Sequence, residues 1–313
     1  MNPATGSTTI TVATQQELSN QAQALLENTL SANTKSAYKS GLKRFDKLGG
    51  TIPATPNQVA EIVAQCDYKP ATLSVMLSAV AKAHKLAGHL NPCDSELVKS
   101  VLQGYRRAKT MKQRRAKPLF SEDVARMVKM DSSNRAIRDN ALLLVGFVSA
   151  MRKSELLSLN IEDVEVCQDG SGFYITLAKS KTDPEGLGHV FHIPNGKTSL
   201  CPAQALEKLL TAMAEVGITT GALFRRVSRG DNFIERLTTN SVSLIFKRMG
   251  HAVGFDANTI SGHSTRRGAI STLDRMNVPR KDIRRLSRHK SDRMIDLYSE
   301  DKEMTINPFS GLL

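Results

Sequence analysis

Apolar residues recur at helical spacing through the first third of the chain. Leu73, Leu77, Val80 and His84 fall on one face of a predicted helix that runs from about Pro70 to Leu86. Similar patterns predict helices from Asn33-Thr34 through Tyr38, Leu42 and Phe45, from Thr55-Pro56 onward, and from Asp94 to Arg107. Turn residues separate these segments. The pattern therefore indicates a bundle of short helices.

The pattern changes after Phe120. Ser121-Glu122-Asp123 is typical of a helix start, and a strongly apolar helix is expected from about 136 to 149. The segments 173–177 and 190–193 are the only convincing strands. They flank turn formers at 179–188, so they predict a β-hairpin with a basic tip. Helices dominate again from Cys201 to the end.

These patterns predict a mainly α fold with two domains. We expect an N-terminal helical bundle, followed by a mostly helical domain that contains a small antiparallel β-hairpin or sheet. The expected boundaries are a flexible tail at 1–30, the helical domain at 31–107, a basic linker at 108–118, the second domain at 119–302 and a C-terminal tail at 303–313.

Charge sharpens this division. The 313 residues carry 43 Lys plus Arg against 30 Asp plus Glu, a net charge of +13. Residues 31–117 alone carry +11 over 87 residues, whereas the part after 117 is nearly balanced. Such a surplus predicts a polyanionic partner, with nucleic acid ahead of an acidic membrane surface. No apolar stretch reaches the roughly 18 residues that span a bilayer, so no membrane protein is expected.

The predicted linker region is the most basic part of the chain. Between 106 and 117 there is no acidic residue, and the basic residues are Arg106, Arg107, Lys109, Lys112, Arg114, Arg115 and Lys117. One interpretation is a solvated tether. The favoured one is a segment that crosses phosphates, because aligned cations repel one another unless a polyanion neutralises them.

Two further surfaces are candidate DNA contacts. The first predicted helix presents Lys39, Lys43 and Arg44 away from its apolar face. A predicted helix over 237–249 has a polar face that carries Thr239, Asn240, Ser243 and Lys247. Asn240 is a candidate base reader, because Asn can pair with adenine in the major groove. Alternatively, these four residues are ordinary solvent-facing positions near a helix start.

The cysteines predict neither a metal site nor a disulfide framework. Cys66, Cys93, Cys167 and Cys201 are far apart, with no C-x-x-C and no paired histidine spacing. Reduced thiols are therefore expected, and no metal or other cofactor. The first thirty residues contain no Lys or Arg, which argues against a secretory signal. We expect a cytoplasmic protein.

Three C-terminal clusters could carry chemistry. The first is Arg152 with Glu155, which by itself could be an ordinary helical ion pair. The second is His263-x-x-Arg266, which places an imidazole and a guanidinium on one helical turn and could grip a phosphate. A structural histidine beside a surface arginine is the alternative. The third is His289, followed nine residues later by a tyrosine in a basic region.

Together with Lys181 at the hairpin tip, these positions match a family in order and spacing. Residues 120–300 resemble the tyrosine recombinases, most closely the Cre-like members. The carrying residues are Arg152, Glu155, Lys181, the run Ser261-Gly262-His263-Ser264-x-Arg266, His289 and Tyr298. The helix and turn pattern of Leu73 to Asp94 is similar too. Each motif alone is weak, but the ordered set is specific.

The resemblance implies a site-specific recombinase that breaks and rejoins DNA through a covalent 3′-phosphotyrosyl intermediate and a Holliday junction. Tyr298 would be the nucleophile. Arg152 and Arg266 would hold the non-bridging phosphate oxygens. Lys181 would protonate the leaving 5′-oxygen.

By the same resemblance, His263 and His289 would bond the phosphate and manage the proton of the tyrosine. Glu155 would orient neighbouring side chains. The partners would be double-stranded DNA with an inverted-repeat site and further copies of the chain. A dimer would form on each site and a tetramer on two sites, with the last helix docking in the neighbouring copy.

One departure from the family concerns Arg288, because a glycine usually precedes the residue corresponding to His289. A basic side chain there could add a DNA contact or change the local backbone.

Two other functions remain open. One is a type IB topoisomerase-like nicking-closing enzyme, which shares the residues but acts as a monomer. The other is a DNA-binding regulator without catalysis, against which the full set of polar residues argues.

Overall fold

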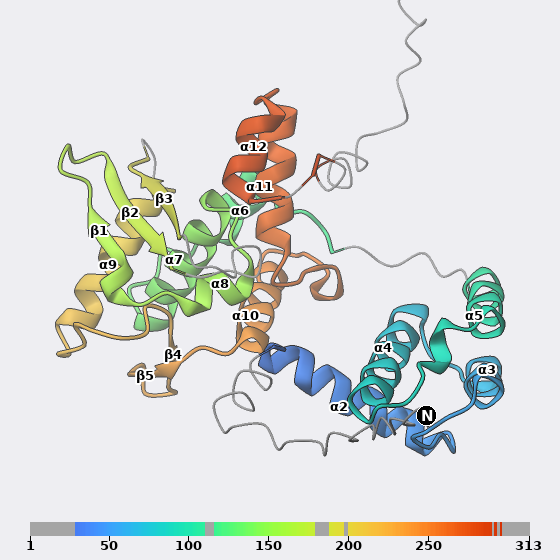
Figure 1. The fold of residues 1–313 in the computed structure, drawn as a ribbon. Helices are drawn as coiled ribbons and strands as arrows, with labels where there is room; N and C mark the ends of the chain where they lie inside the picture. Colours follow the sequence, from blue (N-terminus) through green and yellow to red (C-terminus); the bar gives the residue numbers. More distant parts are fainter. Residues whose placement is uncertain are drawn as a thin grey trace, which may run out of the picture. The chain divides into compact units, whose positions relative to one another are not determined.

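The computed structural model describes residues 29–109, 116–178, 188–196, 200–289, 291–292 and 295. The chain divides into two compact units, Met1–Gln113 and Arg114–Leu313. Figure 1 shows a helical first unit and a second unit in which a small sheet lies at one side of the helices. The prediction of a mainly helical chain with a small antiparallel sheet is confirmed.

The first unit is a bundle of helices around its own core. Its elements are α2 (Ala32–Lys47), α3 (Pro56–Gln65), α4 (Pro70–Leu86), the 3₁₀ helix η1 (Pro92–Asp94) and α5 (Glu96–Ala108). α2 packs on α4, and α3 packs on α5. Ser31 caps α2, because its hydroxyl accepts from the N–H of Thr34. The cap therefore lies two residues before the predicted Asn33-Thr34.

The second unit contains the remaining elements. The helices are α6 (Ser121–Met127), α7 (Asn134–Val148), α8 (Lys153–Ser158), α9 (Pro202–Ala214), α10 (Thr239–His251), α11 (Ser264–Arg275) and α12 (Arg280–Ser287), with 3₁₀ turns η2 (Ile161–Asp163) and η3 (Ala257–Thr259). The strands are β1 (Val164–Val166), β2 (Gly172–Leu177), β3 (His189–Pro194), β4 (Arg225–Val227) and β5 (Phe233–Arg236). The apolar helix α7 is central, and it packs on both α9 and α11.

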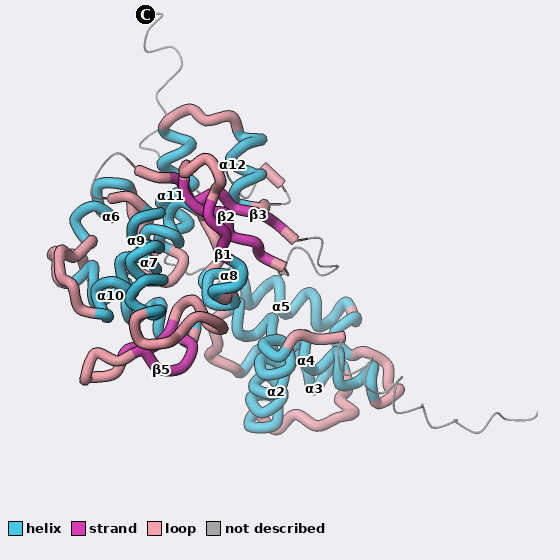
Figure 2. The backbone as a smooth tube through the Cα atoms, turned by 90° about the vertical axis from the view of Figure 1, so that its left-hand side faces the viewer, coloured by secondary structure: helices cyan, strands magenta, loops and turns pink. Residues whose placement is uncertain are grey.

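The strands form two antiparallel sheets (Figure 2). β2 pairs with β3, so that Phe173 lies opposite Ile193 and Leu177 opposite His189. The predicted hairpin pairing is thereby confirmed. β1 adds a third strand, and β4 with β5 makes a second ribbon. The expectation of only two strands was wrong, because these extra strands are only three or four residues long and depend on partners distant in sequence.

α11 positions the chain that enters the second unit. The Leu119 N–H donates to the Ser264 carbonyl at 3.1 Å, and the Lys117 N–H donates to the Thr259 carbonyl at 2.7 Å. A Cβ on Gly268 would lie 1.6 Å from the Leu119 carbonyl oxygen. Only glycine allows the backbone to pass this close to the helix. The first turns of α11 are thus fixed to the segment 116–119.

Three further findings concern the described part of the chain. It contains no helix that is both long and apolar enough to cross a membrane. No group of three or more His, Cys, Asp or Glu side chains within it could hold a metal ion. The four cysteines are free thiols, and three of them are buried.

The close approach at Gly268 generates a stability prediction. Gly268→Ala should destabilise the second unit by about 3 kcal/mol, because its methyl group would overlap a backbone carbonyl that cannot move alone. Gly104→Ala, in the middle of the exposed part of α5 with nothing within 4 Å, is the matched control. It should stabilise the first unit by about 0.5–1 kcal/mol. Calorimetric unfolding of the full chain measures both, and an unchanged Gly268→Ala transition would contradict the contact.

Candidate active site

The turn between α7 and α8 presents the first arginine of the motif set. α7 ends at Val148, and Ala150 adopts a left-handed conformation with φ of 47°. Arg152 is the residue that caps α8. Its backbone N–H donates to Glu155 Oε2 at 2.8 Å, and its Nη1 donates to Glu155 Oε1 at 2.7 Å. One carboxylate therefore fixes both the backbone and the side chain of Arg152.

Glu155 accepts a third hydrogen bond. Arg288 Nη2 donates to Glu155 Oε2 at 2.5 Å, and the Glu155 side chain is only 4% exposed. Burial alone would raise the pKa of this carboxyl. The Arg152 N–H and the charges of Arg288 and Arg152 outweigh burial, so the pKa lies below its ordinary value. The group is ionised at neutral pH.

Arg266 links the α7–α8 turn to the end of α12. It lies on α11 and is 2% exposed. Its Nη1 donates to the Ala150 carbonyl at 2.5 Å, and its Nη2 donates to the Ser287 carbonyl at 2.5 Å. Nη2 also lies 2.9 Å from His289 Nε2. The guanidinium is therefore held from three directions before any substrate is present.

The bond to Arg266 decides the protonation of His289. A guanidinium can only donate, so Nε2 of His289 must accept, and the ring proton is on Nδ1. Nδ1 lies 3.0 Å from the Ser287 hydroxyl and donates to it. Burial, followed by the charges of Arg266, Arg152 and Arg288, lowers the pKa of His289 to about 4. The ring is neutral at physiological pH.

His263 stands at the start of α11 beside these groups. Its N–H donates to the Ser261 hydroxyl at 3.1 Å. The preceding Gly262 donates to the Ser243 hydroxyl at 3.2 Å, and a Cβ there would lie 2.8 Å from Lys153 Cδ. The residue as a whole is exposed, but its ring is partly buried, and this burial is the largest cause of its lowered pKa. The charges of Lys153, Arg266 and Arg152 lower the pKa further. His263 is thus also neutral at physiological pH.

The assembled groups form a site for an anion. The guanidinium groups of Arg152 and Arg288 converge on one carboxylate, Arg266 bonds the neutral His289, and His263 lies beside them. The cations exceed the acidic charge by two. Bidentate guanidinium groups and neutral imidazoles are the donors that suit a phosphodiester and a proton transfer on it.

Comparison with known proteins assigns the family. The model of the phage integrase family matches residues 117–304, well over half of the chain. The integrase/recombinase XerD homolog of Selenomonas ruminantium is 30% identical over 299 residues, which covers 91% of this chain and 86% of the relative. The chain belongs to the phage integrase family. It is an enzyme of the tyrosine recombinase type.

Solved structures of other integrases share the fold. A lambda integrase dimer bound to a COC′ core site matches with a TM-score of 0.61 at 21% identity, over 92% of this chain and 97% of that one. The Tn1549 transposon integrase with transposon right end DNA matches with a TM-score of 0.57 at 14% identity, over 91% and 94%. None of these relatives bears on the Cre-like subgroup expected from the sequence.

The structure brings together most of the predicted catalytic residues of this integrase. Arg152 bonds Glu155, Arg266 bonds His289, and His263 lies beside them. The predicted nucleophile Tyr298 and the predicted acid Lys181 lie outside the described residues. Their roles stay predictions.

The α10 candidates differ in their surroundings. Thr239 and Asn240 are exposed in the first turn, and Lys247 is half-buried. Ser243 accepts from the Gly262 N–H, so its hydroxyl positions the loop before His263. Contact with a base remains a prediction for these residues, and for Ser243 the structure adds a second role.

The basic candidates of the first unit and linker are also in different settings. On α2, Lys39 and Lys43 are exposed and Arg44 is half-buried. Arg106 and Arg107 are exposed near the end of α5, where Arg106 also donates to the Ser74 hydroxyl at 3.1 Å. Lys109 pairs with Asp67, and Lys117 lies 3.7 Å from Asp123. Lys112, Arg114 and Arg115 lie outside the described residues.

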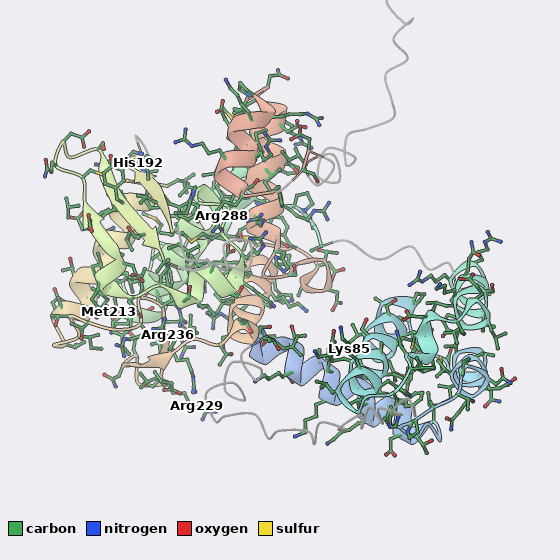
Figure 3. The ribbon with its side chains drawn as sticks, in the orientation of Figure 1. Lys85, His192, Met213, Arg229, Arg236 and Arg288 are labelled. Atoms are coloured by element: carbon green, nitrogen blue, oxygen red, sulfur yellow. The ribbon has the colours of Figure 1, made fainter. Side chains whose placement is uncertain are left out.

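Sequence reasoning singled out Arg288 but left its role open, and it missed Lys153 in the site and Arg267 beside it. Arg288, labelled in Figure 3, lies between β3 and the α11–α12 pair and contacts Glu155. Lys153 lies against Gly262 and His263. Arg267 donates to the Ala116 carbonyl and holds the entering segment on α11. For Arg288 the available signal was the departure from glycine at that position. For Lys153 and Arg267 it was their place directly after Arg152 and Arg266.

The neutral state of His289 generates a pH prediction. Because the folded pKa of about 4 lies below the ordinary 6.5, the unfolded chain takes up a proton first as pH falls. Above pH 6.5 the neutral His289 ring carries no such penalty. As the pH falls from 6.5 to 4, the free energy of unfolding should decrease by roughly 2–3 kcal/mol.

The measurement is an NMR titration of the histidine rings in the full chain, together with urea unfolding at pH 7 and 4.5. His289→Gln assigns the resonance and removes this titration. The variant should lose less stability on acidification than the parent. A His289 ring that titrates near pH 6.5 would contradict the buried, arginine-bonded state.

Proposed function

We propose that this integrase exchanges DNA strands at specific sites through a covalent 3′-phosphotyrosyl intermediate and a Holliday junction. The Tyr298 oxygen attacks the scissile phosphorus, the bond to the 5′-oxygen breaks, and a free 5′-hydroxyl leaves. The convergence of Arg152, Arg266 and His289 beside a buried carboxylate carries the proposal, because it is built for a phosphate. Rejoining reverses these steps.

The arginines stabilise the charge that develops on the phosphorane. Arg266 is held by two carbonyls and His289, so it needs little reorganisation when the phosphate binds. Arg152 is held by Glu155. Loss of one such preorganised donor typically costs about 10²–10³ in rate.

Proton transfers fall to the neutral histidines and to Lys181. The lowered pKa of His263 leaves its ring able to receive the phenolic proton when Tyr298 attacks. His289 accepts from Arg266 and thereby holds that guanidinium in place for the phosphate. Lys181 then supplies the proton of the leaving 5′-oxygen.

The partners are double-stranded DNA and further copies of the chain. We propose an inverted-repeat site that binds a dimer, and a tetramer on two sites as in the Cre-like members. Supporting this, the lambda integrase structure is a dimer on a core site and the XerH structure holds its difH substrate. The contacts would come from the basic residues 106–117, from α2 and from α10. The free thiols and the DNA substrate favour the cytoplasm.

A trapping experiment tests the nucleophile. The full chain is incubated with a suicide DNA substrate nicked beside the cleavage site, and the covalent complex is measured on a denaturing gel. The parent should be trapped, and Tyr298→Phe should not, because it lacks the attacking oxygen. Tyr174→Phe, at a 43% exposed position on β2, is the control and should be trapped normally. A covalent complex with Tyr298→Phe would reject the assignment.

A truncation separates the recombinase from a topoisomerase-like enzyme and from a catalytically inactive regulator. Removal of residues 303–313, which lie outside the described part, should leave DNA binding and covalent trapping intact but abolish synapsis of two sites. Electrophoretic mobility of one-site and two-site DNA measures this. A truncated chain that recombines like the parent would refute docking of the tail. A parent that only relaxes supercoils would favour the topoisomerase.

A further inference from the structure

Arg288 occupies a backbone conformation that favours glycine. It ends α12 with φ of 56° and ψ of 42°, the left-handed region. This conformation is unfavourable for a residue with a Cβ. The other described non-glycine residues with positive φ are Ala150, Asp231 and Asn277. Asp and Asn tolerate this region, so the two poorly suited residues, Ala150 and Arg288, both lie at the active site.

The Arg288 side chain returns into the site and is enclosed there. It is 11% exposed, its Nη2 reaches Glu155 Oε2 at 2.5 Å, and its Cζ lies 4.8 Å from the centre of the Phe191 ring. Phe191 is a buried residue of β3. The guanidinium is therefore held between a carboxylate and an aromatic face, both of which attract it. Figure 3 shows its place between the sheet and α12.

The division of Glu155 between two arginines has a consequence for Arg152. Arg152 Nη1 bonds Oε1, whereas Oε2 receives the Arg152 N–H and Arg288. A free carboxylate would accept a guanidinium in a two-pronged fork. With Arg288 on Oε2, Arg152 bonds through one nitrogen, and its other N–H groups stay available for a phosphate.

We propose that Arg288 is a positioning residue for the phosphodiester reaction: by occupying Oε2 of Glu155 it prevents a two-pronged Arg152–Glu155 pair and keeps Arg152 directed at the scissile phosphate. This inference rests on the proposed function. The contact with Phe191 also holds β3, which follows the segment that contains Lys181. The energy of the left-handed backbone is offset by these two contacts.

Electrostatics provides an independent readout. The charge of Arg288 is one cause of the lowered pKa of His289, after burial, Arg266 and Arg152. It also contributes to the lowered pKa of His189 at the start of β3, after burial, while Arg285 lowers it further and Glu155 opposes them. Removal of Arg288 should raise both pKa values, which a histidine titration detects.

The test is single-turnover cleavage of the suicide substrate by the full chain. Arg288→Gly relieves the backbone and removes the side chain. It should melt at the same or a higher temperature than the parent and bind DNA within threefold of it, yet cleave at least tenfold more slowly. Arg288→Lys keeps a cation near Glu155 and should recover part of the rate. Asn277→Gly, which relieves a left-handed residue away from the site, should cleave at the parental rate.

A double-mutant cycle with Glu155→Gln tests whether Arg288 acts through Glu155. If Arg288 acts through Glu155, adding Arg288→Gly to Glu155→Gln should slow cleavage by less than threefold further. Equal losses in both backgrounds would overturn the proposal, as would a parental rate for Arg288→Gly. A weaker, less salt-dependent DNA affinity with an unchanged rate would also overturn it and assign a phosphate contact.

The outcomes separate this inference from the function on which it rests. If the parent forms no covalent complex, or if Tyr298→Phe still forms one, the proposed function fails. If the parent is trapped, Tyr298→Phe is not, and Arg288→Gly matches the parent, only the positioning role fails.

Discussion

The Glu155 carboxylate is the contact on which the active site depends, because it holds two arginines that would otherwise repel each other. It accepts from the Arg152 backbone, the Arg152 side chain and Arg288, and it is almost fully buried. Removal of Glu155 would leave two guanidinium groups without their shared carboxylate, and loss of one side of a buried ion pair typically costs 3–5 kcal/mol. Glu155 and Arg266 are therefore the two side chains that join the α7–α8 turn to the end of α12.

The same constraint explains why the site is suited to an anion. A second set of bonds through Arg266 joins the Ala150 and Ser287 carbonyls to a neutral His289. Among the described residues of the site, three guanidinium groups lie with one carboxylate, so cationic charge is in excess there. A phosphate would supply the opposite charge. Preorganised donors of this kind act at the transition state because they do not have to reorient during the reaction.

Much of this could be predicted from the sequence, and the limits are physical. The order and spacing of Arg152, His263-x-x-Arg266 and His289 identified the groups, because each motif lies within one helical turn or cap. The hairpin followed from two strand-like segments that flank a run of turn formers at 179–188. The bond between Arg288 and Glu155 could not be predicted, because it joins residues 133 positions apart. The use of Ser243 by Gly262 depends likewise on how α10 packs beside the α11 loop.

The helix that carries Arg266 is also the one that receives the entering chain. Gly268 allows the Leu119 backbone to lie against α11, Arg267 bonds the Ala116 carbonyl, and Leu119 donates to Ser264. These contacts fall on the same two turns as His263 and Arg266. A displacement of the segment 116–119 would therefore also displace His263 and Arg266. The backbone of Leu119 lies directly against Gly268, and no flexible side chain lies between them to take up the movement. The segment 116–119 and the first turns of α11 are thus held together by backbone contacts within the second unit.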